Sequence, residues 1–165
     1  MHLTFFNAMQ SHISQFFAGA LIAISALAAH AQTQAENTRA GTVKLVKGLV
    51  QLENTQGSKA LLPGDAVNVA DVLTTGADGA TSLVLRDGST LIVGPSSRLE
   101  LKRFAFDATT QDGNLLVSVL RGTLRMITGL IGKTRPEAVE VHTPTTIIGV
   151  LGTDFIVQAE GEVKP

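Results

Sequence analysis

The sequence contains no cysteine, no tryptophan and no tyrosine among its 165 residues. The lack of cysteine excludes disulfides, a thiol nucleophile, cysteine-ligated zinc and a lipid-modified cysteine after a leader. The near-absence of aromatic residues removes the platforms on which nucleobases and sugars stack. Acidic and basic residues nearly balance, and no basic stripe marks a nucleic-acid surface. We therefore expect no nucleic-acid partner.

Apolar residues are concentrated near the N-terminus, in the stretch FFAGALIAISALAAHA at 16–31. This run of about 16 residues is shorter than the roughly 20 that a membrane-spanning helix needs. It ends in Ala29-His30-Ala31, the small-x-small pattern that signal peptidase cleaves. A retained membrane anchor is therefore the weaker alternative. No Lys or Arg precedes the run, although a leader normally begins with one, so its orientation in the membrane is poorly encoded by charge. We predict a signal peptide at 1–31, cleaved after Ala31, and a periplasmic or secreted protein with no membrane span in its mature chain.

The remaining sequence divides into three parts. Residues 32–40 (QTQAENTRA) are polar and aperiodic, which predicts a flexible linker. A β domain is expected at 41–160 and a C-terminal tail at 161–165. A domain of this size buries roughly two-thirds of its unfolded surface, so we expect it to fold without disulfides.

Short runs rich in Val, Leu, Ile and Thr alternate with Gly, Asp, Asn and Pro clusters from Gly41 onward, which is typical of an all-β domain. The segments 48–53 (GLVQLE) and 97–102 (SRLELK) alternate apolar and polar residues, as half-buried strands do. In contrast, 81–86 (TSLVLR) and 90–94 (TLIVG) are apolar on both faces, and 115–120 (LLVSVL) nearly so, as expected for central strands covered on both sides. We predict a two-layer antiparallel β-sandwich or short β-roll of about ten short strands.

Tight turns support the antiparallel arrangement. Asp87-Gly88 lies between two of the apolar runs and predicts a type I′ hairpin turn, in which both residues have positive φ. On that basis Gly88→Val should cost more stability than Ser89→Ala. Pro63-Gly64-Asp65 marks a further reversal.

The order of these turns and strands resembles the FecR-domain family from Gly41 to about Val157. The matching segments are GTVKLVKGLVQL, LLPGDAVNVADVLTTGADGATSLVLRDGSTLIVGPSSRLEL, LLVSVLRGTLRM and VHTPTTIIGVLGTDFIV. The resemblance implies a periplasmic all-β module, of the kind known from sensors that relay ferric-siderophore signals from outer-membrane receptors to sigma factors. This sequence departs from the family pattern in two ways. The cytoplasmic sigma-binding segment, membrane helix and receptor-contacting subdomain of those regulators are not expected here, and Leu151 stands where the family often has Arg.

His142 is the one histidine outside the predicted leader and the first candidate for chemistry. In AVEVHT it shares the polar face of a strand with Glu140, so it could act as a base. The sequence offers it no nucleophile, which favours a solvated surface histidine over a hydrolase. Asp87-Gly88-Ser89 has the wrong residue order for an aspartic protease, and a second copy to complete the dyad is missing.

Asp65, Asp71 and Asp78 recur in turns and are candidate calcium ligands, but their spacing lacks the alternate oxygen ligands and closing Glu of a calcium loop. Phe104 and Phe106 have the opposite parity to the leucines before them, which predicts a bulge near Arg103 that turns them into the core; a contact patch is the alternative. Phe155 is also assigned to the core.

We therefore predict no catalytic, cofactor-binding or metal-binding residues and no cofactor. The interpretation is an exported, non-catalytic FecR-like binding domain with a sensing or regulatory role in the cell envelope. Its partner would be another envelope protein or cell-surface component. The alternative is a structural or adhesive module that binds cell-wall glycan or another envelope protein.

Overall fold

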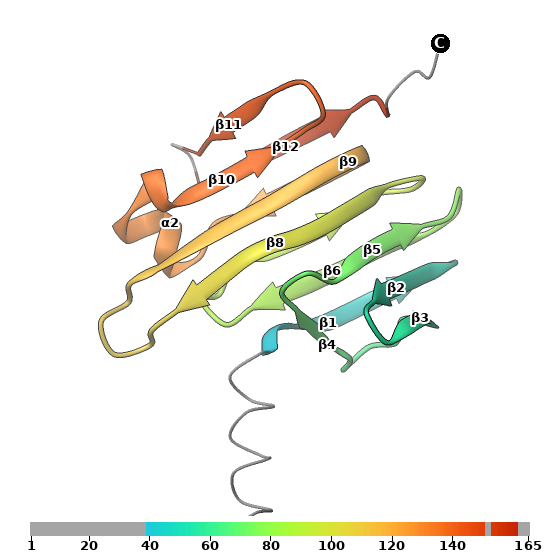
Figure 1. Cartoon of the computed structure of the whole chain (residues 1–165), viewed down its shortest axis with the longest axis horizontal. Helices are drawn as coiled ribbons and strands as arrows, with labels where there is room; N and C mark the ends of the chain where they lie inside the picture. The colour runs from blue at the N-terminus through green and yellow to red at the C-terminus, as the bar shows by residue number, and fades with distance from the viewer. Residues whose placement is uncertain (1–38, 151–152, 162–165) are drawn as a thin grey trace, which may run out of the picture. The chain divides into compact units, whose positions relative to one another are not determined.

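The computed structural model describes residues 39–150 and 153–161, which form twelve strands and a short helix (Figure 1). The strands are β1 Arg39–Lys47, β2 Val50–Asn54, β3 Gly57–Ala60, β4 Ala66–Asn68, β5 Val72–Thr75, β6 Ala80–Leu85, β7 Thr90–Val93, β8 Arg98–Phe106, β9 Gly113–Ile127, β10 Val139–His142, β11 Ile147–Gly149 and β12 Asp154–Ala159. Helix α2 (Leu130–Thr134) and the 3-10 turn η1 (Pro136–Ala138) follow β9. The all-β class is confirmed. The strands outnumber the ten expected because the stretch 50–75 is divided into four short ones.

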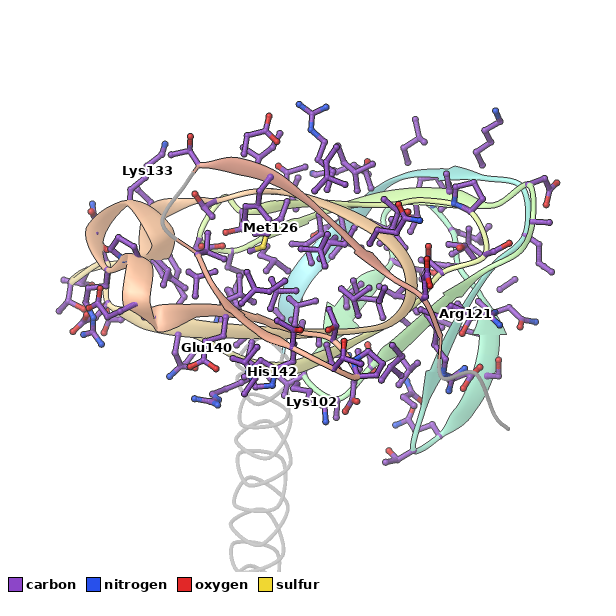
Figure 2. All side chains as sticks on the ribbon, turned by 90° about the horizontal axis from the view of Figure 1, so that it is seen from above. Lys102, Arg121, Met126, Lys133, Glu140 and His142 are labelled. Atoms are coloured by element: carbon purple, nitrogen blue, oxygen red, sulfur yellow. The ribbon has the colours of Figure 1, made fainter. Side chains whose placement is uncertain are left out.

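One hydrogen-bonded path joins most strands in the order β3-β2-β5-β8-β9-β7-β6-β1-β4, and it curls over into two layers (Figures 1 and 2). Strand β9 belongs to both layers. Its first half pairs with β8 and β10, and its second half pairs with β7 and β12. We call the layer of β3, β2, β5, β8, β10, β11 and the first half of β9 sheet B. Sheet A contains β4, β1, β6, β7, β12 and the second half of β9.

Alternating aliphatic side chains from the two sheets form the core. Val50 and Leu52 are buried on β2, as are Leu99 and Leu101 on β8, and this confirms the predicted alternation. Leu73 on β5 lies among them with 0% exposure. Each such leucine contributes about 1.5–3 kcal/mol to the free energy of folding relative to an exposed one. The same alternation sends the intervening polar residues to the outside of each layer.

The three runs that are apolar on both faces differ in how well they are covered. Residues 115–119 on β9 are all buried, so this central strand is covered on both sides as expected. On β6 and β7 only every second residue is buried, and the outward-facing Val84 and Ile92 are only partly buried. The expectation for these two strands is therefore wrong for the single chain, because their outer face in sheet A is left partly open.

Strands β9 and β10 pair in parallel, whereas every other ladder among residues 39–150 and 153–161 is antiparallel. A parallel pair needs a crossover connection instead of a tight turn. Helix α2 and turn η1 provide that connection. The predicted antiparallel sandwich is thus corrected at this one ladder, since tight-turn signals say nothing about segments joined by a longer connection.

The hairpin between β6 and β7 is present, but its turn is not type I′. Gly88 has φ of +84°, whereas Asp87 is not among the residues with positive φ. The Gly88 amide donates to the Leu85 carbonyl at 3.0 Å, and the Leu85 amide donates to the Ser89 carbonyl at 2.8 Å. This pattern fits a three-residue loop in which a turn is followed by a glycine in the left-handed region. Asp87 keeps an ordinary backbone because its side chain has a separate role, described below.

Of the predictions made for the N-terminal segment, only the end of the linker falls within the described residues. Strand β1 begins at Arg39, so Arg39 and Ala40 belong to the sheet and not to the expected linker at 32–40. The predicted signal peptide at 1–31 and most of the tail at 161–165 lie outside the described residues. Among the residues that are described, no helix is long and apolar enough to cross a membrane.

Candidate binding surfaces

His142 lies at the end of β10 on the outer face of sheet B, as predicted, with about a quarter of its side chain exposed. Its Nε2 is 2.8 Å from Oε2 of Glu140 (Figure 2). Ser118 is its neighbour on β9 in the parallel ladder, but this serine is only 6% exposed and has little access to a substrate. The structure thus shows a histidine held by a carboxylate, with a nearly buried serine as its ladder neighbour.

Asp87 and Ser89 form a buried hydrogen-bonding unit that closes the β6–β7 hairpin. Their side chains are 1% and 0% exposed. The Ser89 hydroxyl donates to Oδ2 of Asp87 at 2.7 Å, and the Ser89 amide donates to Oδ1 at 3.0 Å. The Gly129 amide, just before α2, donates to the Ser89 hydroxyl at 2.8 Å. The carboxylate is thus committed to structure, which agrees with the hairpin interpretation and leaves it out of reach of a substrate.

Two of the three candidate calcium ligands, Asp65 and Asp71, accept backbone hydrogen bonds within their own turns. Oδ2 of Asp65 accepts the Leu62 amide at 3.0 Å and lies 3.1 Å from the Lys59 ammonium. The hydrogen bond from the Leu62 backbone amide lowers the pKa of Asp65 most, and Lys59 lowers it further. Asp71 is 3% exposed and accepts the Asn68 amide at 2.8 Å. Across the described part of the chain, no three acidic or histidine side chains come together as a metal site requires.

The bulge predicted near Arg103 is confirmed. The register of β8 against β9 shifts between Leu101 and Arg103, and Phe104 is consequently 9% exposed and belongs to the core. The guanidinium of Arg86 lies 5.7 Å from the centre of the Phe104 ring. Phe106 and Phe155 are partly buried and pack against the core. The phenylalanines therefore fill the interior and do not form a contact patch.

The turn at 143–146 ends β10 and leads into β11. Thr143 and Thr146 are joined by a backbone hydrogen bond of 2.8 Å, and the Thr146 amide also donates to the Thr143 hydroxyl at 3.0 Å. A hollow of about 500 Å³ lies between this turn and the end of β12, lined by Thr143, Pro144, Thr145, Gln158, Ala159 and Glu160. Leu151 and Gly152 lie outside the described residues.

Among residues 39–150 and 153–161, strand β11 pairs only with β10, and it is therefore a free edge of sheet B in this part of the chain. The hydrogen bond from Thr143 to Thr146 fixes the alternation of the hairpin, so the backbone N–H and C=O of Ile147 point away from β10. The Ile147 side chain is 70% exposed. An apolar residue with unpaired backbone groups at a sheet edge is the arrangement to which an extended peptide adds as a further strand.

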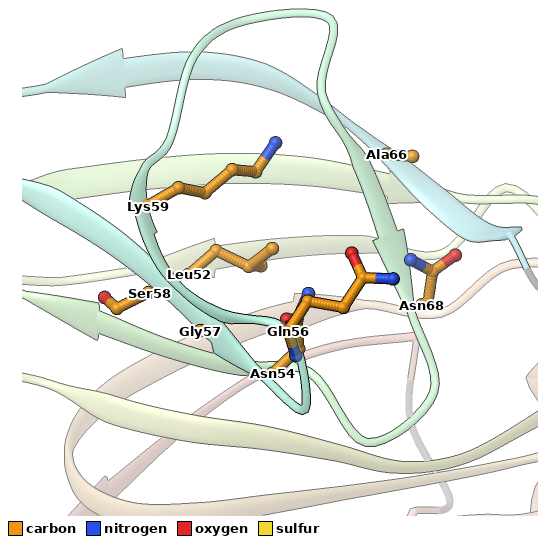
Figure 3. A pocket seen from close by; sticks show the side chains of 8 residues that line it. All are labelled: Leu52, Asn54, Gln56, Gly57, Ser58, Lys59, Ala66 and Asn68. Atoms are coloured by element: carbon orange, nitrogen blue, oxygen red, sulfur yellow. The ribbon is translucent and has the colours of Figure 1, made fainter.

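A second hollow of about 370 Å³ lies between the β2–β3 hairpin and β4, which are the two ends of the strand path (Figure 3). Buried Leu52 contributes to its wall, and the polar lining consists of Asn54, Gln56, Ser58, Lys59 and Asn68. Figure 3 shows Lys59 and Gln56 reaching from the hairpin toward β4. Because Lys59 is paired with Asp65, the hollow offers mainly neutral amide and hydroxyl groups.

Sequence reasoning missed both hollows and the free edge at Ile147. The composition of Asn54–Gly57 is typical of a turn, but nothing in these residues shows that the side-chain amides of Asn54 and Gln56 face β4 across the ends of the sheet. The apolar Ile147 was not distinguishable from a core residue, since alternation alone does not reveal which strand is at an edge.

Comparison with known proteins adds one family and one structure. The model of the family described as FecR protein matches residues 71–164, which run from the start of β5 to the end of the described chain and beyond it. No match is found among the curated proteins. One solved structure, described as a cell surface anchoring domain, is 24% identical, with a TM-score of 0.36; the match covers 38% of this chain and 83% of that one. The β11 edge lies inside the matched span, and the amide-lined hollow lies outside it.

Proposed function

The chain belongs to the FecR family, and we propose that it is an exported, non-catalytic binding domain with a sensing or regulatory role in the cell envelope. The observation that carries this proposal is the family match over residues 71–164, because it includes β5 to β12 and with them the free edge at β11. As noted for the sequence resemblance, members of the family are periplasmic modules of signalling regulators. The partner in this proposal is another envelope protein.

We place the partner on β11. An incoming strand would hydrogen-bond to the outward backbone groups of Ile147 and cover its exposed side chain. His142 is the ladder neighbour of Ile147 on the same outer face, so its pair with Glu140 would lie one strand away from the added strand, across β11. The Thr143–Thr146 turn and its hollow adjoin the same edge and offer the partner a second point of contact.

Site-specific photo-crosslinking in growing cells tests this placement. A photoreactive amino acid at Ile147 is expected to give a discrete adduct whose protein component mass spectrometry identifies. The matched control is the same amino acid at Ser58, which is exposed on β3, the opposite free edge of sheet B. Ile147→Lys should abolish binding of the identified protein, and Ser58→Lys should not. Adducts of equal yield at both positions, or none at Ile147, would contradict the proposal.

The amide-lined hollow supports a second candidate function, binding of a neutral glycan. Amide and hydroxyl groups both donate and accept hydrogen bonds, as sugar hydroxyls require. Co-sedimentation with purified cell-wall glycan tests it. The double substitution Gln56→Ala and Asn68→Ala should release the protein, whereas Gln158→Ala, which removes an exposed amide from the other hollow, should not. Equal sedimentation of both variants would exclude this site.

A further inference from the structure

The outer face of sheet A carries an ordered arrangement of aliphatic side chains that the single chain leaves open. Its strands are β1, β6, β7, the second half of β9, and β12, side by side in that order. The exposed fractions are 55% for Leu45, 37% for Ile127 and 67% for Ile156, while Val84 and Ile92 are less exposed and only partly buried. An exposed apolar area of this kind on a sheet marks an interaction surface.

The ladder registers place these side chains in two adjacent rows across the five strands. The first row, from β1 to β12, is Leu45, Ser82, Ile92, Arg125 and Ile156. The second row, in the same order, is Thr42, Val84, Thr90, Ile127 and Asp154. The first row alternates between apolar and polar residues and has an apolar residue at each end. The second row also alternates but has a polar residue at each end. Both rows therefore read the same in either direction, with β7 at the centre.

We propose that this face binds a second copy of the chain about a two-fold axis that runs along β7. Such an axis lays β1 of one copy over β12 of the other, β6 over β9, and β7 over β7. Leu45 then meets Ile156 of the partner subunit, and Val84 meets Ile127 of the partner subunit. Ile92 meets its own counterpart. Every aliphatic residue of the two rows faces an aliphatic residue, as the self-complementary surface of a two-fold dimer requires.

The charges on the face also fit a second copy. The only ionic groups in the two rows are Arg125 and Asp154, which pair with each other through contacts of 2.7 and 3.0 Å. The charges within the two rows therefore balance, and the further charge beside them is Lys44, which is exposed at the bulge of β1 between Thr42 and Leu45 and would lie over β12 of the partner subunit. The outer face of sheet B differs, since it carries Glu53, Arg98, Glu100, Lys102 and Glu140. Depletion of unpaired charge is typical of the centre of a protein interface.

The size of the face predicts a weak dimer. Five strands about 4.8 Å apart, each contributing roughly six residues of about 3.3 Å, span on the order of 24 by 20 Å. Covering that area buries about 500 Å² per copy and about 1,000 Å² in total, which is near the lower limit for a specific interface. We therefore expect dissociation in the micromolar range or weaker. Two sheets packed face to face align within about 30°, so the proposed packing is the ordinary one for a sandwich.

Sedimentation velocity over a micromolar concentration series, on the protein purified after expression of the full chain, measures this association. The unmodified protein should shift from monomer to dimer as its concentration rises. Ile92→Lys puts two like charges at the axis and should leave the protein monomeric, with an unchanged circular dichroism spectrum as the check on folding. The control Ile147→Lys adds the same charge to an even more exposed isoleucine off this face and should leave the dimer intact.

A complementation experiment tests the geometry itself. Leu45→Lys and Ile156→Glu should each weaken self-association at least tenfold, because each buries an uncompensated charge twice per dimer. Mixing the two variants should restore a mixed dimer, since Lys at position 45 then faces Glu at position 156 of the partner subunit. A protein that stays monomeric throughout the series would refute the proposal. So would a dimer that tolerates both single substitutions, as pairing of two β12 edges would produce, or a mixture that does not recover association.

This inference is independent of the partner placed on β11. Ile92→Lys should abolish the dimer and preserve the photo-crosslink at position 147, whereas Ile147→Lys should preserve the dimer and abolish binding of the crosslinked protein. The failure of either proposal is therefore visible without reference to the other.

Discussion

Replacing Ser89 by alanine removes a single oxygen atom from the closed end of the β6–β7 hairpin. That oxygen donates to the Asp87 carboxylate at 2.7 Å and accepts the Gly129 amide at 2.8 Å, and the serine is 0% exposed. Alanine would leave the carboxylate with one donor fewer and the Gly129 amide without its acceptor, both away from water. The substitution also loosens the point at which α2 is attached to the hairpin.

The magnitude follows from these two losses. A hydrogen bond to a charged group contributes about 1.5–3 kcal/mol, and a buried donor left unpaired costs about 1–3 kcal/mol. Because some relaxation is expected, we predict a loss of about 3 kcal/mol for Ser89→Ala. Gly88→Ala should cost only about 1–2 kcal/mol, since φ there is +84° but an added Cβ would meet no atom within 4 Å. Gly88→Val adds further strain but should still cost less than Ser89→Ala. This order reverses the one that the sequence predicts.

Urea unfolding of the three variants measures the difference as a shift in midpoint at constant slope. A double-mutant cycle with Asp87→Ala separates the pair from the general effect of truncation. The double variant should lose less than the sum of the two single losses, because removing both partners leaves fewer buried groups unsatisfied. Equal midpoints for Ser89→Ala and the unmodified protein would show that the buried hydrogen bonds are replaced by water, and the reasoning would be wrong.

Three further substitutions test other parts of the structure. Gly122→Ala should cost about 2–4 kcal/mol in urea unfolding, because φ is +89° and the new Cβ would overlap Ser97; a cost below 1 kcal/mol would contradict the sheet-switching geometry of β9. The pKa of Asp65 is lowered in the folded chain, mainly by the Leu62 amide, so its stabilisation is present above its unfolded pKa of about 4 and lost as the pH falls through the lower folded value. Asp65→Asn should therefore flatten the acid limb of a plot of stability against pH, and an unchanged limb would argue against the turn bond. His142→Ala should change stability by less than about 0.5 kcal/mol, as expected for a partly exposed side chain, and a larger loss would give this histidine a structural role.

Local features of the fold were readable from the sequence where one residue type determines the outcome. The alternation of Leu99 and Leu101 predicted the buried face of β8, and the change of parity before Phe104 predicted the bulge. The turn type was not readable, because Asp87-Gly88 occurs both in two-residue turns and in longer loops. The parallel pairing of β10 with β9 depends on a long connection that carries no tight-turn signal. The hollows depend on which strand ends meet in space, and no local pattern encodes that.

Strands β6 and β7 are apolar on both faces, yet the single chain covers only one face of each, and this difference supports the proposed dimer. Val84 and Ile92 belong to runs that are apolar on both faces, a pattern typical of strands covered on both sides. The inner face of these strands packs in the core, and the outer face in sheet A is only partly buried. In the proposed dimer that outer face packs against the same face of the second copy, with Val84 against Ile127 of the partner subunit and Ile92 at the axis. The second copy then covers the outer face, which explains why β6 and β7 carry apolar residues on both faces. If the Ile92→Lys variant still formed a dimer, the apolar residues on the outer face would have no such explanation.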